Sequence, residues 1–193
     1  MSTARKIVIT GAPGSGKTVI TRALADAHPD RFVLVTEAAT QVYTMLQTRW
    51  DQLDLEGRRD VQRRIYHLQV EQEERFSREH PDKTLLLDRG TIDGAAYWPE
   101  GPQDYWRDLG THADREIARY DAVILLETCA ALGLYDGADS NFCRFEDAQA
   151  ALLASERLKH LWSPHPRVRY VGASPRLEDK LAQVRQALDS LSV

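Results

Sequence analysis

The chain has 193 residues, 42% hydrophobic and 28% charged, a length and composition typical of one globular domain with a sizeable core. Its 25 basic and 29 acidic residues give a net charge of −4, which argues against a constitutively basic nucleic-acid-binding protein. No stretch approaches the roughly 20 apolar residues of a membrane span, and the N-terminus lacks the apolar core of a secretion signal. The two cysteines, Cys129 and Cys143, suit a reducing compartment, so we expect a cytoplasmic protein without a membrane span.

Short apolar runs alternate with helical patterns along the chain, which indicates βαβ units and a mainly parallel sheet. Continuous apolar runs predict buried strands at residues 6–10, 32–35, 84–87, 122–126 and 168–171. Helical patterns cover residues 18–27, 38–50 and 58–80, and another helix runs through Trp162. In the last helix Ser174 is expected to cap and Pro175 to take the first helical position. We therefore predict a single α/β domain over residues 1–193.

The middle of the chain, residues 90–121, is less regular than the rest. Its aromatic residues stand beside turn-forming residues, and they are Tyr97, Trp98, Tyr105 and Trp106. This pattern favours a helix, a loop and another helix lining a pocket, but ordinary core and loop packing explains it equally well.

A glycine-rich segment matches the phosphate-binding pattern G-x-x-x-x-G-K-[ST] in full, between an apolar run and a helical segment as that pattern requires. Its glycines let successive backbone amides point at phosphate oxygens, and the following helix adds partial positive charge. Lys17 would reach the β- and γ-phosphates, and the Thr18 hydroxyl would ligate Mg²⁺. We predict binding of ATP, with GTP possible, together with Mg²⁺, through Gly11, Ala12, Pro13, Gly14, Ser15, Gly16, Lys17 and Thr18.

Charged residues stand at the carboxyl ends of predicted strands, where ligands bind in open α/β sheets. Asp88 directly follows an apolar run and is predicted to hold Mg²⁺ directly or through water. Arg89 would contact a transferred phosphoryl or an acceptor group, or else form an ion pair with Asp88 or Glu37. Glu37 is a candidate base for an acceptor hydroxyl, and equally an ordinary acid at a helix start.

Residues 133–141 are rich in turn formers and lead into a helical pattern that runs through Trp162. We interpret residues 133–162 as a lid that carries Arg144 towards the phosphates, since phosphoryl transfer benefits from a mobile cation. Ordinary surface charge is the alternative reading of Arg144.

Other patterns argue against two classes of protein. The D-x-x-G pattern at residues 54–57 follows a polar stretch, and the chain has no N-K-x-D guanine reader, so a Ras-like GTPase is not expected. The six histidines and two cysteines show no metal-binding spacing, so no metal other than nucleotide-bound Mg²⁺ is expected.

Together, the phosphate-binding segment, V-T-E-A-A at residues 35–39, L-D-R-G-T at 87–91 and N-F-C-R-F-E at 141–146 resemble one P-loop family. It is the AAA-domain family that contains the kinase domain of NadR and the TRPL-translocation-defect protein, and the resemblance covers nearly the whole chain. It implies a nucleoside- and nucleotide-kinase-like P-loop fold, a three-layer sandwich around a five-stranded, mainly parallel sheet. It also implies that Glu37, Asp88 and Arg89 face a phosphate acceptor.

The leading hypothesis is a Mg²⁺-dependent kinase that transfers the γ-phosphoryl group of ATP to a hydroxyl of a nucleoside-like small molecule. Its catalytic residues would be Lys17, Glu37, Asp88, Arg89 and Arg144, with Thr18 and Asp88 as metal ligands. Its partners would be a nucleoside triphosphate and an unidentified small-molecule acceptor, not nucleic acid. The alternative is a regulatory ATP- or GTP-binding NTPase switch that acts through a protein partner.

Overall fold

The computed structural model describes residues 4–135 and 147–191. Its centre is a five-stranded parallel sheet in the order β2-β3-β1-β4-β5, and the predicted α/β fold class is confirmed. Each strand lies where an apolar run predicted it: β1 (Arg5–Gly11), β2 (Phe32–Val35), β3 (Thr84–Asp88), β4 (Ala122–Leu126) and β5 (Val168–Val171).

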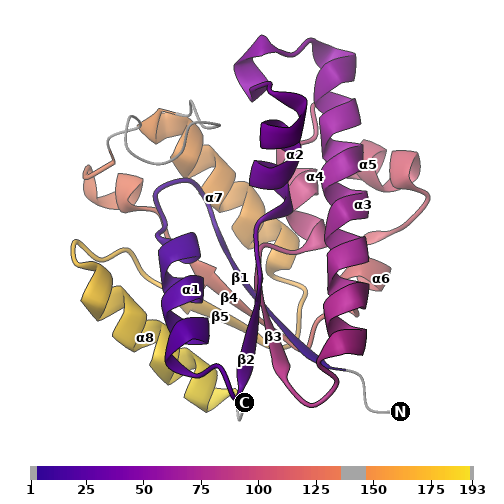
Figure 1. Ribbon diagram of the computed structural model, residues 1–193. Helices are drawn as coiled ribbons and strands as arrows, with labels where there is room; N and C mark the ends of the chain where they lie inside the picture. Colours follow the sequence, from indigo (N-terminus) through magenta and orange to yellow (C-terminus); the bar gives the residue numbers. More distant parts are fainter. Residues whose placement is uncertain (1–3, 136–146, 192–193) are drawn as a thin grey trace.

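Helices cover both faces of this sheet, which gives the three layers of the sandwich (Figure 1). The helices α1 (Lys17–Ala27) and α8 (Leu177–Ser190) pack on one face. The other face is covered by the helices of the middle of the chain, with a second helical pair, α2 and α3, at one end. These helices are α2 (Ala38–Leu46), α3 (Leu55–Glu79), α4 (Gly94–Tyr97), α5 (Pro102–Leu109), α6 (Ala113–Ile117) and α7 (Ala148–Trp162).

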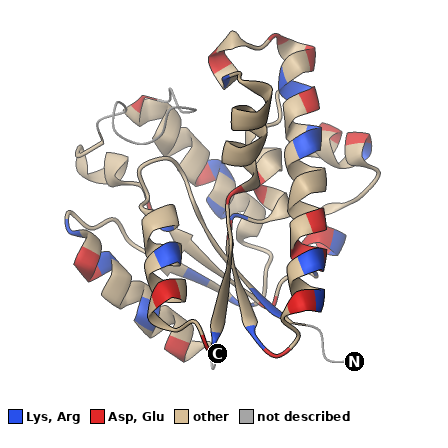
Figure 2. Ribbon diagram, viewed as in Figure 1, with Lys and Arg blue, Asp and Glu red and all other residues tan. Residues whose placement is uncertain are grey.

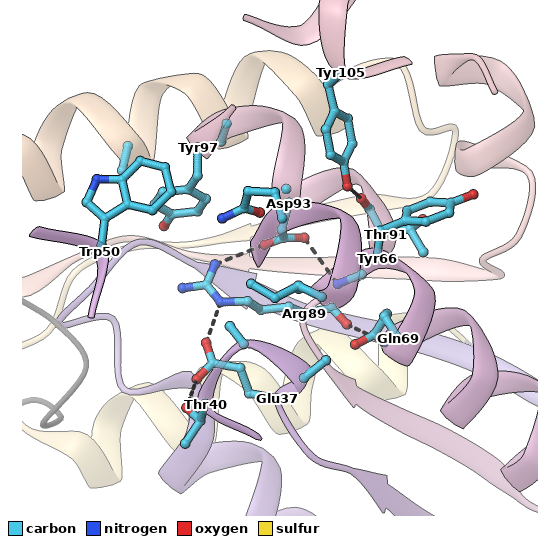
Figure 3. A pocket seen from close by; sticks show the side chains of 18 of the residues that line it. Glu37, Thr40, Trp50, Tyr66, Gln69, Arg89, Thr91, Asp93, Tyr97 and Tyr105 are labelled. Atoms are coloured by element: carbon cyan, nitrogen blue, oxygen red, sulfur yellow. Dashed lines mark hydrogen bonds and ion pairs between the residues drawn. The ribbon is translucent and has the colours of Figure 1, made fainter. Parts of the chain in front are cut away.

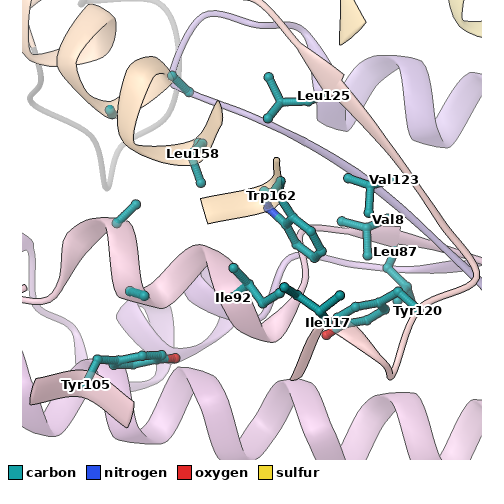
Figure 4. Close-up of a cluster of buried hydrophobic side chains, with 14 of the residues drawn as sticks. Val8, Leu87, Ile92, Tyr105, Ile117, Tyr120, Val123, Leu125, Leu158 and Trp162 are labelled. Carbon is teal, nitrogen blue, oxygen red and sulfur yellow. The ribbon is translucent and has the colours of Figure 1, made fainter. Parts of the chain in front are cut away.

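The alternation of side chains along the central strand produces two cores. Ile7 and Ile9 of β1 pack under α1 and α8, whereas Val8 between them faces the opposite side. On that opposite side Trp162 and Tyr120 are stacked edge to face, with ring centroids 5.5 Å apart (Figure 4). Both faces of the sheet are therefore apolar, as the continuous apolar runs indicated.

Three helix boundaries differ from the prediction by two residues or more, and the first is that of α3, which begins at Leu55 rather than at residue 58. The helix expected over residues 38–50 ends at Leu46, because Gln47 adopts a left-handed conformation with φ 50° and terminates it. The last helix begins at Leu177 rather than at Pro175, because the Ser174 hydroxyl accepts a hydrogen bond from the Arg176 amide and forms a local turn before the helix.

Charged side chains lie mainly on the outer faces of the helices, and both signs alternate along α3 and α8 (Figure 2). The D-x-x-G pattern has a structural explanation: Asp54 caps α3 by accepting a 2.8 Å hydrogen bond from the Gly57 amide. In the described part of the chain, no helix is both long and apolar enough to cross a membrane.

Candidate active site

The glycine-rich segment forms the turn between the central strand β1 and helix α1. Gly16 precedes the helix with φ 79°, a left-handed conformation that favours glycine, and no side chain caps the first amides of α1. The N-terminal end of this helix, with its partial positive charge, therefore faces the segment where phosphates are expected.

The shape of this loop is fixed by the neighbouring strand β4. A Cβ atom on Gly11 would lie 2.4 Å from the Leu126 backbone oxygen, so only glycine fits there without a shift of backbone. Thr128, just beyond β4, donates a 2.6 Å hydrogen bond to the Pro13 oxygen, and the Cys129 amide donates to the Gly14 oxygen at 3.1 Å. These two hydrogen bonds tie the loop to the segment that follows β4.

Asp88 ends β3 next to this loop. Its Oδ2 accepts a 2.6 Å hydrogen bond from Thr18 Oγ1, so the two residues predicted to hold Mg²⁺ are in contact. Burial, followed by the negative charge of Glu37, raises the pKa of Asp88, while Lys17 and the Thr18 hydrogen bond oppose that shift. Asp88 Oδ1 and Ser15 Oγ are buried and have no hydrogen-bond partner among the described residues.

Those unpartnered oxygens suit a metal-bound nucleotide. Mg²⁺ prefers oxygen ligands and keeps several waters, so a hydroxyl and a single carboxylate are a sufficient protein contribution. Within the described residues, no group of three or more histidine, cysteine or acidic side chains could hold a different kind of metal centre. Thr18 and Asp88 therefore fit the predicted Mg²⁺.

Arg89 follows Asp88, and its guanidinium group lies between Glu37 and Asp93 (Figure 3). Its φ is 79°, an unusual value for a residue with a side chain. Its Nε donates to Glu37 Oε1 at 2.6 Å, and its Nη1 donates to Asp93 Oδ1 at 3.1 Å. Burial opposes the charge, but Tyr97, Glu37 and Asp93 outweigh it and raise the pKa of Arg89 well above its usual value.

The predicted ion pair between Arg89 and Glu37 is therefore present, and it does not exclude a role for either residue towards a ligand. Thr40 also donates a 2.6 Å hydrogen bond to Glu37 Oε2, which fixes that carboxylate. Arg89 Nη2 makes no hydrogen bond with the described residues, and the Arg89 side chain lines a cavity.

Asp93 is a site residue that the sequence analysis missed. It is 3% exposed and accepts hydrogen bonds from Thr10 Oγ1, from the Gly90 amide at 3.1 Å and from Trp162 Nε1 at 3.2 Å, besides Arg89. The only signal in the sequence is an aspartate one helical turn after Arg89. Besides the nearby Arg89 and Gly90, its partners come from two distant segments, which the sequence does not bring together.

A cavity of about 310 Å³ opens beside Glu37 and Arg89, between α2, α3, α4 and α7 (Figure 3). Its volume is that of a small-ligand site. The predicted pocket in the middle of the chain is confirmed in part: Tyr97 and Tyr105 line the cavity, but Trp98 and Trp106 are buried in the core. Aromatic side chains make much of its wall, and they are Tyr43, Trp50, Tyr66, Tyr97 and Tyr105.

A buried polar network holds two of these rings. The Tyr66 hydroxyl donates a 3.0 Å hydrogen bond to Glu116, and burial, then the charge of Glu116, raises the pKa of Tyr66 to about 12. The Tyr105 hydroxyl donates to the Thr91 oxygen at 3.1 Å, and the Thr91 hydroxyl donates to Glu116 at 2.8 Å. The polar ends of both rings are therefore bound to the protein.

The structure describes only part of the proposed lid, residues 133–162. Arg144 and Cys143 lie outside the described residues, so the expectation for Arg144 stays a prediction. Helix α7, in the second half of the expected lid, buries Leu158 and Trp162 in the core. Its Arg157 lines the cavity, and Lys159 pairs with Glu127 at 3.0 Å.

Three comparisons place this geometry among known proteins. A family model described as an AAA domain matches residues 6–180. The crystal structure of NadR protein in complex with NR has a TM-score of 0.69 and 16% identity, covering 98% of this chain and 50% of that one. The structure of NadR protein in complex with NAD and AMP-PNP has a TM-score of 0.67 and 15% identity, with 98% and 49% covered. No curated protein gives a significant match.

The chain thus spans about half the length of these solved structures, and at such low identity the likeness shows the fold. The family match covers far more than half of the chain, including the phosphate-binding loop, Glu37 and the Asp88–Arg89 pair.

Proposed function

This chain belongs to the AAA-domain family of P-loop enzymes, of the kinase or NTPase type, and from that premise we propose that it is a small-molecule kinase. In this proposal it transfers the γ-phosphoryl group of ATP, with Mg²⁺, to a hydroxyl group of a nucleoside-like acceptor. The domain would act as one unit over residues 1–193.

One observation carries the proposal: two consecutive residues at the end of β3 face two different sites. Asp88 faces Thr18 and the phosphate-binding loop, with 2.6 Å between their oxygens. Arg89, the next residue, lines the aromatic cavity together with Glu37. A phosphoryl group and a small molecule bound at these sites would therefore be neighbours, which is what group transfer between them requires.

On the phosphate side, the backbone amides before α1 and the Lys17 ammonium group would bind the β- and γ-phosphates. Thr18 and Asp88 would hold Mg²⁺, which when bound neutralises charge on the phosphate oxygens. Asp88 Oδ1, buried without a hydrogen-bond partner among the described residues, supports this assignment.

On the acceptor side, Glu37 would accept the proton of the attacking hydroxyl group. The hydroxyl oxygen then bonds to the γ-phosphorus, the bond from that phosphorus to the β,γ-bridging oxygen breaks, and ADP leaves. Arg89 would keep Glu37 oriented through Nε and offer Nη2 to an oxygen of the acceptor or of the transferring group. Arg144 would add positive charge from the proposed lid.

The acceptor class is inferred from the cavity. Its volume of about 310 Å³ and its aromatic walls suit a sugar that carries a flat ring. A structure of similar fold is described as a complex with NR, which makes nicotinamide riboside one acceptor to test.

The test is ADP release from Mg-ATP across a panel of nucleosides, nicotinamide riboside and other small hydroxyl compounds, with Lys17→Ala as the blank. Turnover that depends on one acceptor class is the expected result. Tight ATP binding with no effect of any acceptor would overturn the proposal and favour the NTPase switch.

A further inference from the structure

Gln62 lies on α3 and lines the aromatic cavity. Its exposed fraction is 5%, yet its side-chain amide makes no hydrogen bond with any residue of the described part of the chain. The Gln62 amide nitrogen and oxygen are not fully buried in the protein interior, so they are open to the cavity that the side chain lines. Gln62 therefore presents one unused donor and one unused acceptor to the cavity.

Several other polar groups of the cavity wall are already bound within the protein. The Glu37 and Asp93 carboxylates both bind the Arg89 guanidinium. The Gln69 amide nitrogen donates to Glu73 at 3.1 Å and to the Arg89 backbone oxygen at 3.2 Å. The hydroxyl groups of Tyr66 and Tyr105 are bound to Glu116 and Thr91. Gln62 differs from these groups because its whole amide is left for a ligand, as Arg89 Nη2 also is.

A second glutamine on the same helix is only partly satisfied within the protein, because its Oε1 is buried without a hydrogen-bond partner among the described residues. Gln72 is also 5% exposed, but it lies outside the cavity wall and its Nε2 donates a 2.8 Å hydrogen bond to Gln41 Oε1. Around Gln62 the neighbouring wall is aromatic and apolar, including Ile65 one turn further along. A leucine would fit such a wall, so packing alone gives no reason for an amide.

We propose that Gln62 determines acceptor specificity by pairing its amide with the edge of a flat ring that carries an adjacent hydrogen-bond donor and acceptor, as in a carboxamide or a lactam. This inference rests on the proposed acceptor role of the cavity. A primary amide can bind such an edge through two parallel hydrogen bonds, as glutamine does on adenine. A carboxylate offers two acceptors only, so one of them would face the Gln62 carbonyl oxygen.

The test is calorimetric titration of the full chain with matched pairs of ribosides. Inosine carries a lactam edge, and purine riboside is the same molecule without it. Nicotinamide riboside carries a carboxamide, and nicotinic acid riboside carries a carboxylate. We expect the amide-bearing member of each pair to bind roughly 5- to 100-fold more tightly, the discrimination of one bidentate pair.

Gln62→Leu should bring each ratio close to one, and Gln62→Glu, which keeps the size but lacks the amide donor, should lower the affinity for inosine. Gln72→Leu is the matched control and should leave the ratios as they are, because its amide faces Gln41. A wild-type protein without the preference, or a Gln62→Leu variant that retains it, overturns the inference. Failure to bind any of these ribosides overturns it as well.

Phosphorylation of the same compounds separates the two proposals. Ribosides that bind with a Gln62-dependent preference but are never phosphorylated would support this inference and overturn the kinase. Ribosides that are phosphorylated at equal rates within each pair would support the kinase and overturn this inference.

Discussion

Thr18 Oγ1 donates a 2.6 Å hydrogen bond to Asp88 Oδ2 across 70 residues of sequence, from the start of α1 to the end of β3. The contact joins helix α1 to β3. Strand β3 also pairs with β1, where Ile9 is aligned with Asp88. Asp88 is thereby placed beside the phosphate-binding loop, with its Oδ1 left without a partner among the described residues.

Asp88→Asn should reduce Mg²⁺-dependent turnover by roughly 100-fold or more, because an amide is a poor ligand where a carboxylate is needed. Nucleotide binding without metal should persist, since the backbone amides of the loop are unchanged. Turnover at varied Mg²⁺ and binding of ATP in chelator measure the two effects. Thr18→Ser retains the hydroxyl group and should keep most of the activity, and equal losses in both variants would contradict the assignment.

Glu37→Gln should lower acceptor-dependent kcat by about 100- to 10,000-fold, the usual contribution of a general base, with little change in the KM for ATP. Steady-state kinetics with the best acceptor of the panel measures this. Glu56→Gln, which neutralises an acid whose side chain is 67% exposed, is the control for the change in net charge. Full activity of Glu37→Gln would show that another group accepts the proton.

Gly11→Ala should destabilise the protein by about 1–3 kcal/mol, since the new Cβ would lie 2.4 Å from the Leu126 backbone oxygen and the backbone must shift. Thermal and urea unfolding measure the loss. Gly172→Ala is the matched control, because its Cβ would meet no atom within 4 Å and its stability should be unchanged. Equal melting temperatures for the two variants would mean that the loop relaxes freely.

Glu73→Gln should lower the free energy of unfolding by about 2–4 kcal/mol, because Glu73 is fully buried and binds Lys6, Arg119 and Tyr120 at 2.9–3.2 Å. Removing its charge leaves Lys6 and Arg119, which are partly buried, without this carboxylate. Urea unfolding measures the change, and Glu74→Gln, an exposed neighbour on the same helix, should stay within about 0.5 kcal/mol of the wild type. A similar small effect for both would show that water replaces the lost contacts.

Asp104→Asn tests a pH-dependent contact between α3, α5 and the core. A hydrogen bond from Trp98 Nε1, then one from Arg59, holds the pKa of Asp104 below its usual value of 3.8. A carboxylate whose pKa is lowered by folding adds stability above its unfolded-state pKa and loses it as the pH falls. The variant should therefore be less stable than the wild type at pH 7, and the difference should shrink below about pH 3.8. A difference independent of pH would assign the effect to packing.

The strands and the phosphate-binding loop could be predicted from the sequence because each is a local pattern of apolar residues or glycines. The acids at the strand ends followed from topology, since parallel strands place their carboxyl ends on one edge. The roles of Asp93 and Gln62 could not be predicted in this way. Their significance depends on what surrounds them: Asp93 gathers donors from distant segments, and Gln62 is distinctive only because its neighbours leave its amide unbound.

The positive φ of Arg89 was likewise beyond a sequence reading. Nothing in D-R-G-T shows that the strained residue is the arginine rather than the glycine after it. The conformation is set by the amide of Arg89 bonding to the Ile9 oxygen while its side chain is held by two carboxylates.

The tryptophans differ in burial, so their fluorescence can report on two different events. Trp98, Trp106 and Trp162 are at most 5% exposed, so their fluorescence reports whether the core is intact. Trp50 stands instead in the cavity wall, where a flat ring arriving beside it would change its emission while the other three stay constant. In a Trp50→Phe protein, ligand binding would no longer change the emission, but the three buried tryptophans would still fluoresce. Ligand binding and unfolding can therefore be measured separately by intrinsic fluorescence, without an attached dye.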